Sequence, residues 1–340
     1  MRAGWRRADF GLHPARIVQK RWAHRSRGSA AARCASFLFD AFTLQEHTAP
    51  AMHITLKLLG AVTLWGGTFV CGRIISPQLG PYSASFLRFL VASLCLLWLL
   101  MRQEGGLPRL APRTLVGVCL LGLTGVFAYN YCFLSGLRTV PAARAAVIVA
   151  ANPVVIALGA ALFLGEALTI MKTLGIAISV SGAVVILSRG APLSLFSQGV
   201  DTGDLFIIGC VASWSAYSLL GKLVMGKISA LAAVALSCTA GALFLLPPAL
   251  AEGLPAALPN ISGLVWGCIL YLGLLGTVVG FTWFYEGVKT IGAAKASVFI
   301  NLVPVSAAIN GMLWLGEPVQ WTLATGAIMV FAGVYLTNRG

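Results

Sequence analysis

The chain contains two copies of one long unit, and the copies align without a gap. From Gly122 onward, adding 151 to a residue number gives the counterpart residue, so Gly122 pairs with Gly273 and Gly136 with Gly287. Other pairs in this register are Gly125 with Gly276, Thr139 with Thr290, Arg144 with Lys295, Pro153 with Pro304, Glu166 with Glu317, Gly175 with Gly326 and Gly182 with Gly333. Many transporters are built from such repeats, because two related helical bundles can rock about a shared site.

The composition indicates that lipid surrounds most of the chain. Hydrophobic residues make up 58% of the sequence, charged residues 10%, and the mean hydropathy is +0.88. About 20 apolar residues cross a hydrocarbon core of roughly 30 Å. The sequence predicts ten such spans, at 54–72, 82–101, 114–134, 142–164, 170–188, 204–223, 229–250, 264–285, 293–315 and 320–337. Continuous apolar runs such as Val147 to Leu164 favour helices over barrel strands, which would alternate in polarity. The predicted fold is therefore all-α, an integral membrane protein of ten transmembrane helices.

Basic residues at the ends of these spans predict the orientation. With the N-terminus inside, the inner side holds Lys57, Arg102, Arg109, Arg113, Lys172, Lys222, Lys227, Lys289, Lys295 and Arg339. The other side holds only Arg73, Arg138, Arg144 and Arg189. Excess Lys and Arg marks the cytoplasmic side, so both termini are expected in the cytoplasm. Each copy has an odd number of spans, five, so the second copy enters from the opposite face. The two five-helix repeats are predicted to be inverted.

The sequence divides into three parts: an extension over 1–51, a first repeat over 52–190 and a second over 203–340. Segment 1–33 of the extension is basic and nearly free of acids. Because Met52 directly precedes the first span, the extension is interpreted as a cytoplasmic tail or an over-extended start. An organellar transit peptide is the alternative.

The membrane part offers little for catalysis or metal binding. All four histidines, His13, His24, His47 and His53, lie at or before the first span. The eight cysteines show no paired spacing, and no zincin motif, nucleophile elbow or phosphate loop occurs. We therefore expect no enzyme, cofactor or metal site. Of the net charge of +14, a large part lies in the extension, which leaves no case for nucleic acid.

Matched helix breaks are the first candidate for a binding site. Pro153 and Pro304 interrupt the fourth and ninth spans at counterpart positions, and Asn152 and Asn301 lie beside them. Each proline frees a carbonyl one turn earlier, which in lipid must face protein, water or substrate. Matched breaks in two repeats point to a midplane site. A plain proline kink, with the amides tying helices together, is the alternative.

Aromatic residues at mid-depth are the second candidate. Trp65 in the first span and Trp214 in the sixth are counterparts at an offset of 149, and Tyr129 and Asn130 lie in the third span. Such side chains can line a cavity for flat or zwitterionic solutes. The alternative places them against lipid or in an interfacial belt.

Three charged residues complete the candidates. Arg88 lies inside the second span, where a charge needs a partner or must snorkel, and one interpretation is that it holds a substrate carboxylate. Glu166 and Glu317 each follow Leu-Gly at the end of a span. They are interpreted as caps of the following helix or ties between helices, and proton coupling is the weaker hypothesis.

The run Leu164-Gly165-Glu166-Ala167-Leu168 and its copy Leu315-Gly316-Glu317-Pro318 resemble the EamA repeat of the drug/metabolite transporter superfamily. Leu87-Arg88-Phe89 and Trp65-Gly66 are similar to that family too, over residues 52 to 340. The resemblance implies a central cavity between two five-helix repeats and alternating access.

The leading functional prediction is a secondary transporter that exports small amphipathic metabolites, such as amino acids, or drugs across a bacterial inner membrane. Alternatives are a passive channel or facilitator, an organellar-type exchanger of phosphate esters or nucleotide sugars, and a membrane sensor. The expected partners are a small-molecule substrate, the lipid bilayer and a second copy of the chain in a homodimer.

Overall fold

The computed structural model describes residues 50–75, 77–136, 148–188, 191, 202–315 and 321–340. The chain forms two compact units, Met1–His53 and Ile54–Gly340, and the account below concerns the second. Nearly all of the extension at 1–51 lies outside the described residues, as do Arg144 and Glu317.

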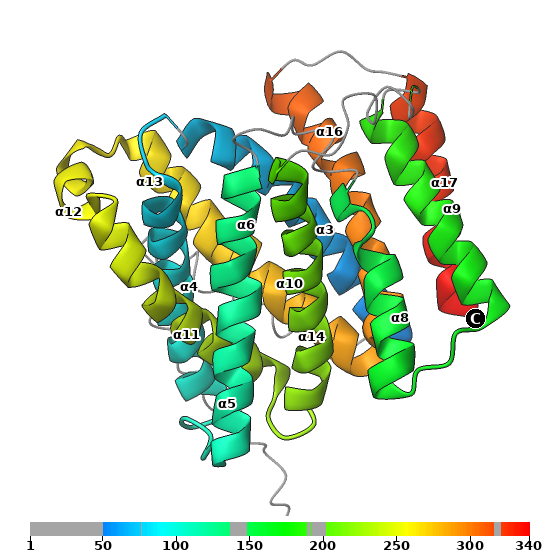
Figure 1. The fold of residues 1–340 in the computed structure, drawn as a ribbon, viewed down its shortest axis with the longest axis horizontal. Coiled ribbons are helices and arrows are strands. Elements are labelled where there is room, and N and C mark those ends of the chain that lie inside the picture. Colours follow the sequence, from blue (N-terminus) through cyan, green and yellow to red (C-terminus); the bar gives the residue numbers. More distant parts are fainter. Residues whose placement is uncertain (1–49, 76, 137–147, 189–190, 192–201, 316–320) are drawn as a thin grey trace, which may run out of the picture. The chain divides into compact units, whose positions relative to one another are not determined.

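The described residues are helical throughout their regular structure and contain no strand (Figure 1). The first half contains α3 (Pro50–Ile75), α4 (Pro81–Gln103), α5 (Pro112–Leu121), the π-helix η1 (Gly122–Ala128), α6 (Tyr129–Gly136), α8 (Asn152–Leu164) and α9 (Ile170–Leu187). The second half contains α10 (Thr202–Val224), α11 (Ala230–Ala251), α12 (Leu254–Ala257), η3 (Leu258–Asn260), α13 (Gly263–Leu270), the π-helix η4 (Tyr271–Val279), α14 (Gly280–Ile291), α15 (Ala293–Val298), the 3-10 turn η5 (Phe299–Leu302), α16 (Val303–Leu315) and α17 (Trp321–Arg339).

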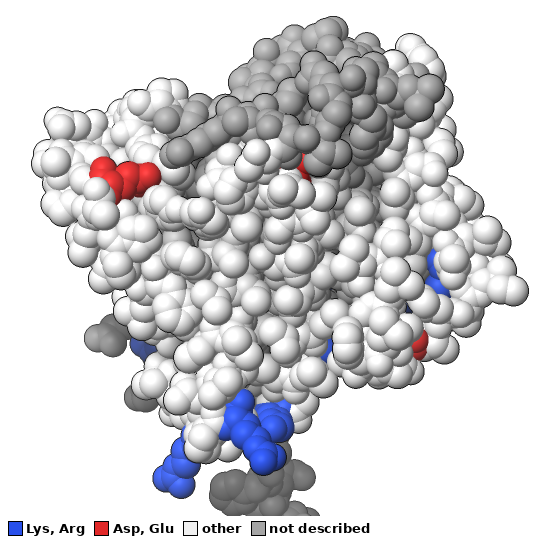
Figure 2. Space-filling view, in the orientation of Figure 1, with Lys and Arg blue, Asp and Glu red and all other residues white. Residues whose placement is uncertain are grey.

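Seven described helical segments are long and apolar enough to cross a membrane: His53–Gly72, Pro81–Gln103, Pro112–Phe133, Thr202–Val224, Ala230–Ala251, Gly263–Ile291 and Trp321–Arg339. Three shorter apolar helices, Asn152–Leu164, Ile170–Val185 and Ala293–Ala307, fall where the sequence predicts the fourth, fifth and ninth spans. Large apolar side chains such as Leu162 and Ile170 are 78% and 82% exposed, which suits contact with lipid. On the face shown in Figure 2, uncharged side chains cover the middle, and basic side chains gather at the lower end.

Helices α4 and α11 are counterparts that pack together in opposite directions. Glu252, which ends α11, accepts backbone N–H groups at the start of α4, from Tyr82 at 3.3 Å and Ser83 at 2.6 Å. Glu104, which ends α4, accepts the hydroxyl of Ser229, the residue that caps the start of α11. Each helix therefore carries at its end the acid that contacts the start of the other.

Helices α9 and α17 are also antiparallel counterparts, and their backbones touch along a glycine seam. A β-carbon on Gly175 would lie 2.7 Å from the Gly333 carbonyl, and one on Gly182 would lie 2.7 Å from the Gly326 carbonyl. Because the residue numbers rise along α9 as they fall along α17, the helices run in opposite directions. They lie side by side in Figure 1.

Other glycine contacts between the halves occur in pairs, once at each of two equivalent positions. Gly125 in η1 faces the ring of Tyr217, and its counterpart Gly276 in η4 faces Thr68, the counterpart of Tyr217. Likewise Gly136 faces Ile207 and Gly287 faces Leu58, while Gly60 faces Trp283 and Gly209 faces Cys132. The third helical segment of each half thus packs on the first helix of the other half. The two halves are interleaved rather than laid side by side.

Polar contacts of three lysines lie at one end of the helices, which we call the basic end. They are Lys57 Nζ to Glu286 Oε2 at 2.5 Å, Lys222 Nζ to the Val288 carbonyl at 3.1 Å, and Lys295 Nζ to the Asn338 carbonyl at 3.1 Å. These contacts bring the start of α3 and the ends of α10, α14 and α17 to the same end.

Candidate functional site

Six aromatic rings pack together where the two halves meet. Trp65 on α3 and Trp214 on α10 contact each other edge to face, with ring centroids 5.7 Å apart. Tyr129 lies 5.6 Å from Trp214, at the junction between η1 and α6. The remaining members are Tyr217, Phe281 and Phe284, whose rings lie 5.3 to 5.7 Å from Trp214. We call this set the central aromatic cluster. Its two counterpart tryptophans come from different halves, so it joins them.

The two tryptophans differ in how their indole N–H groups are used. Trp65 Nε1 donates to the Gly276 carbonyl at 2.8 Å, in the π-helix η4. Trp214 Nε1 is buried and has no hydrogen-bond partner among the described residues. The side chains are almost equally buried, at 8% and 7% exposed. A buried donor without an acceptor costs free energy, so the Trp214 N–H has an unmet hydrogen-bond requirement that the Trp65 N–H does not have.

Arg88 is held beside this cluster by its neighbours on α4 and η4. Its Nε donates to Thr277 Oγ1 at 2.9 Å, and its guanidinium carbon lies 4.9 Å from the ring centroid of Phe89. Phe89 in turn lies 6.3 Å from Phe281 of the cluster. No carboxylate of the described residues forms an ion pair with Arg88.

Asn130 connects η1 to α4 next to Arg88. Its Nδ2 donates to the Val126 carbonyl at 2.5 Å, and its Oδ1 accepts from Ser85 Oγ at 3.4 Å. Ser85 lies three residues before Arg88 and so on the same side of α4. Asn130 is 7% exposed, and its bonds position α4 against the segment that carries Tyr129.

The chain is interrupted at both prolines. Pro153 lies in the first turn of α8, directly after a turn at 150–151, and Pro304 lies in the first turn of α16, after the 3-10 turn η5. Asn152 accepts from Ser215 Oγ at 3.4 Å, and Ser215 adjoins Trp214. Asn301 donates instead to Ser179 Oγ on α9 at 3.1 Å, while its Oδ1 has no partner among the described residues. The structure therefore brings Trp65, Tyr129 and Trp214 together, with Arg88 and Asn130 beside them. Asn152 reaches this cluster indirectly, through its bond to α10, whereas Asn301 bonds to α9.

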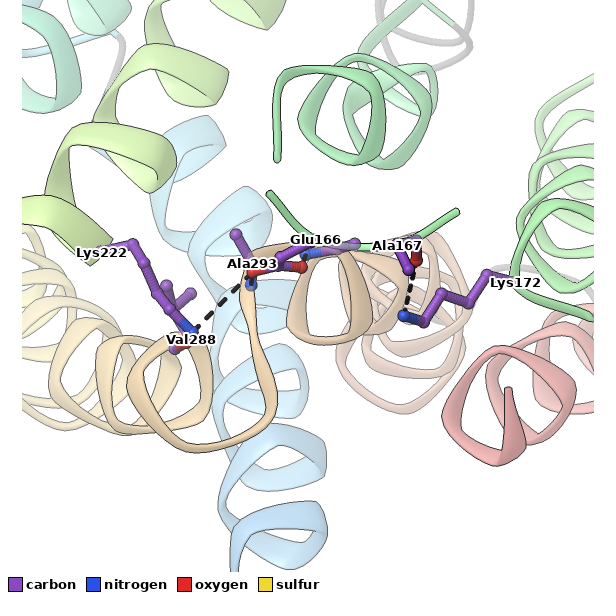
Figure 3. A network of polar contacts seen from close by, with 7 residues as sticks. Glu166, Ala167, Lys172, Lys222, Val288 and Ala293 are labelled. Carbon is purple, nitrogen blue, oxygen red and sulfur yellow. Dashed lines mark hydrogen bonds and ion pairs between the residues drawn. The ribbon is translucent and has the colours of Figure 1, made fainter. Parts of the chain in front are cut away.

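Glu166 lies at the basic end, apart from the aromatic cluster, in the network of Figure 3. Its carboxylate accepts the backbone N–H groups of Ala293 at 2.9 Å and Ala294 at 3.3 Å, at the start of α15. Lys222 Nζ lies 3.8 Å from Glu166 Oε1. Glu166 therefore does not cap the following helix, α9; it contacts the start of α15 in the other half, which is the second interpretation, a tie between helices. Thr169 serves the start of α9, accepting from the backbone N–H of Lys172 at 3.2 Å.

Sequence reasoning missed Thr277, Ser85 and three cluster members. Tyr217 follows Trp214 by three residues, and Phe284 follows Phe281 by three, so each pair shares one face of its helix. That spacing could have indicated from the sequence that the aromatic rings lie together. Thr277 gave none, because its place depends on η4, where its hydroxyl donates to the carbonyl of Leu272, five residues earlier.

Comparisons with known proteins agree with this architecture. Residues 53–188 and 201–339 each match the EamA-like transporter family. The "Uncharacterized transporter YyaM" of Bacillus subtilis (strain 168) is 30% identical over 85% of this chain and 94% of its own length. The "Probable terminal-alkyne amino-acid exporter" of Streptantibioticus cattleyicolor is 30% identical, over 83% of this chain and 92% of that protein. A protein of known crystal structure matches in fold, with a TM-score of 0.67 at 20% identity, over 84% of this chain and 96% of that chain.

The family match covers most of the chain, and its two segments correspond to the two copies of the repeated unit. The relatives are named as transporters, and the described helices are long and apolar enough for a membrane. The chain therefore belongs to the EamA-like transporter family of the drug/metabolite transporter superfamily, and it is an integral membrane transporter.

Proposed function

We propose that this chain is a secondary transporter that exports amino acids or related small amphipathic solutes by alternating access. In this proposal ten transmembrane helices form two inverted five-helix repeats, with both termini in the cytoplasm of a bacterial cell and the chain in its inner membrane. The central aromatic cluster, with Arg88 and Asn130, is the substrate site.

The observation that carries the proposal is the antiparallel packing of counterpart helices. Counterparts α4 and α11, like counterparts α9 and α17, run in opposite directions, as expected if the second repeat enters the membrane from the other face. Inverted repeats provide two related bundles that exchange conformations, so a site between them opens to each side in turn. The counterpart tryptophans Trp65 and Trp214 meet at that junction.

The substrate class is supported by the chemistry of the site and by one relative. Aromatic rings provide an apolar surface, and Arg88 and Asn130 provide polar groups beside it, which suits a small solute with one apolar and one polar part. The similar protein from Streptantibioticus cattleyicolor is named as a probable terminal-alkyne amino-acid exporter. Basic residues at one end of the helices support a cytoplasmic location for that end.

Transport by purified protein in liposomes tests the proposal. We expect a radiolabelled amino acid from a mixed panel to accumulate above its external concentration when an ion gradient is imposed, and to equilibrate only when the gradient is collapsed. Empty liposomes are the control. Flux that never exceeds equilibrium would make the protein a passive facilitator, and saturable binding without flux would make it a sensor.

A further inference from the structure

We infer that Arg88 and Trp214 together bind a carboxylate, so that the site selects solutes carrying a carboxylate and rejects those that are only cationic. The inference rests on the proposed function, since it names the chemical class that the central site takes. Four features of the described residues lead to it.

Arg88 has hydrogen-bond donors to spare. A guanidinium presents five N–H groups in a planar fork. Only Nε is used, toward Thr277 Oγ1, which leaves the terminal nitrogens without a protein acceptor among the described residues. A charged group within a membrane span is costly unless it is paired. The free fork matches the two oxygens of a carboxylate.

No acid of the described chain is placed to neutralise Arg88. The acidic residues lie at or near helix ends, and they are Glu104, Glu166, Asp204, Glu252 and Glu286. Glu286 is already paired with Lys57, and Glu166 and Glu252 accept backbone N–H groups. The central site therefore carries a positive charge that an anionic ligand group would balance.

Trp214 supplies a second unused donor. Its indole N–H is buried and unpaired, whereas the N–H of its counterpart Trp65 is bonded to a carbonyl. Two residues in equivalent positions with similar burial thus differ in whether the indole N–H has an acceptor. The difference is expected if the Trp65 N–H stabilises the fold and the Trp214 N–H donates to the solute.

Arg88 and Trp214 flank the same aromatic residues. Tyr129 lies 5.6 Å from Trp214, and the next residue, Asn130, bonds to Ser85, three residues before Arg88 on α4. Phe281 lies 5.4 Å from Trp214 and 6.3 Å from Phe89, on which the guanidinium rests. A carboxylate held by the fork and the indole N–H would place its apolar substituent against the Tyr129 and Phe281 rings. Because none of the described acids contacts the site, an ammonium group on the solute would meet ring faces and neutral oxygens such as Asn130 Oδ1 rather than a carboxylate.

Matched sets of ligands test the inference by the thermal stability of the purified protein, which bound ligand raises. Each set contains an amino acid, its methyl ester and its deaminated acid, for leucine, phenylalanine and tryptophan. We expect the amino acid and the deaminated acid of at least one set to raise the melting temperature, and the ester, a cation, to leave it unchanged. Stabilisation by esters, or by no carboxylate in any set, would overturn the inference.

Variants identify the donors. Replacing a charge-assisted hydrogen bond should weaken carboxylate binding by about tenfold or more, so we expect this for Arg88→Gln. Arg88→Lys keeps the positive charge in the span but lacks the planar guanidinium. We therefore expect it to fold like the unmodified protein and to lose part of its affinity for the carboxylate. Trp214→Phe should weaken binding of the carboxylate several-fold. Arg102→Gln is the matched control, because Arg102 is exposed at the far end of the same helix and should leave affinity unchanged.

The two proposals fail in different ways. Carboxylate binding that depends on Arg88, without accumulation in liposomes, would leave the site assignment intact and remove the secondary-transport proposal. Accumulation of a solute whose binding is unaffected by Arg88→Lys and Trp214→Phe would support secondary transport and remove the site assignment.

Discussion

Trp65 and Trp214 are equivalent residues with unequal surroundings. Each lies in the first helix of its half and packs against the other, yet only Trp65 donates a hydrogen bond, to the Gly276 carbonyl. A pair of this kind separates the energy of a hydrogen bond from that of ring packing, because the same substitution removes the same volume at both positions.

Phenylalanine at each position is therefore expected to have different effects on the unliganded protein. Trp65→Phe removes the N–H and leaves its buried carbonyl acceptor without that partner, whereas Trp214→Phe removes a donor that is already unpaired. We expect Trp65→Phe to be the more destabilising by about 1–2 kcal/mol in the free energy of unfolding. Chemical denaturation in mild detergent measures the difference, and equal losses would contradict the assigned hydrogen-bond pattern.

Among the helices, counterparts are joined in two ways. Helices α4 and α11 are linked by acids at their ends, and α9 and α17 by contact between glycine backbones. Small residues allow close helix approach in lipid, where apolar burial gives helices no reason to associate. The two pairs differ in the kind of substitution that should disrupt them.

A methyl group in the glycine seam should separate α9 from α17. Gly175→Ala places a β-carbon within 2.7 Å of backbone atoms of α17, and overpacking of this kind costs about 1–3 kcal/mol. Gly267→Ala is the matched control, since that helical glycine has no atom within 4 Å of the added carbon. The melting temperature should fall for the first variant, and for the control stay level or rise. A control that falls as far would mean that helix packing is not the cause.

Glu166 should contribute to stability by capping α15 rather than to transport by proton coupling. Glu166→Gln weakens the acceptor at the start of α15 and removes the charge near Lys222, so we expect a stability loss of about 1 kcal/mol. The pH dependence of transport should stay that of the unmodified protein, also when Glu317→Gln is added. A flattened pH profile in the double variant would instead favour proton coupling.

Across the whole molecule, the basic end is expected to face the cytoplasm. Single cysteines at Arg109 and Lys227, in a background without other cysteines, should resist a membrane-impermeant thiol reagent added to intact cells. Cysteines at Gln78 and Asn260 should react, because Gln78 contacts Ser262 at the opposite end of the helices. The reverse pattern would invert the assigned orientation, and labelling of all four would contradict a bundle that spans the bilayer.

Much of the fold follows from the sequence because hydropathy and repeat spacing are local signals. The apolar segments, the breaks at Pro153 and Pro304, the helical class and the family were all predicted and agree with the structure. The repeat register identifies equivalent positions but not which helices touch. It therefore did not predict that Glu166 would bond to α15, or that the third segment of one half would pack on the first helix of the other.

The site was predicted less completely. Trp65, Tyr129 and Trp214 do meet, and Arg88 lies beside them, because mid-span polar and aromatic residues mark helix faces that turn inward. Asn301 looked equivalent to Asn152, but its partner is Ser179 on α9. Hydrogen-bond partners depend on side chains that differ between the copies, so repeat symmetry does not predict them. The assignment of these residues to substrate stays a prediction.

The doubled glycine contacts accept different partner side chains in the two halves. Gly209 faces the thiol of Cys132, while its counterpart Gly60 faces the far larger indole of Trp283. Both positions allow the helices to approach closely, although one partner is a thiol and the other an indole. A substitution at one of these positions therefore need not be matched at its counterpart.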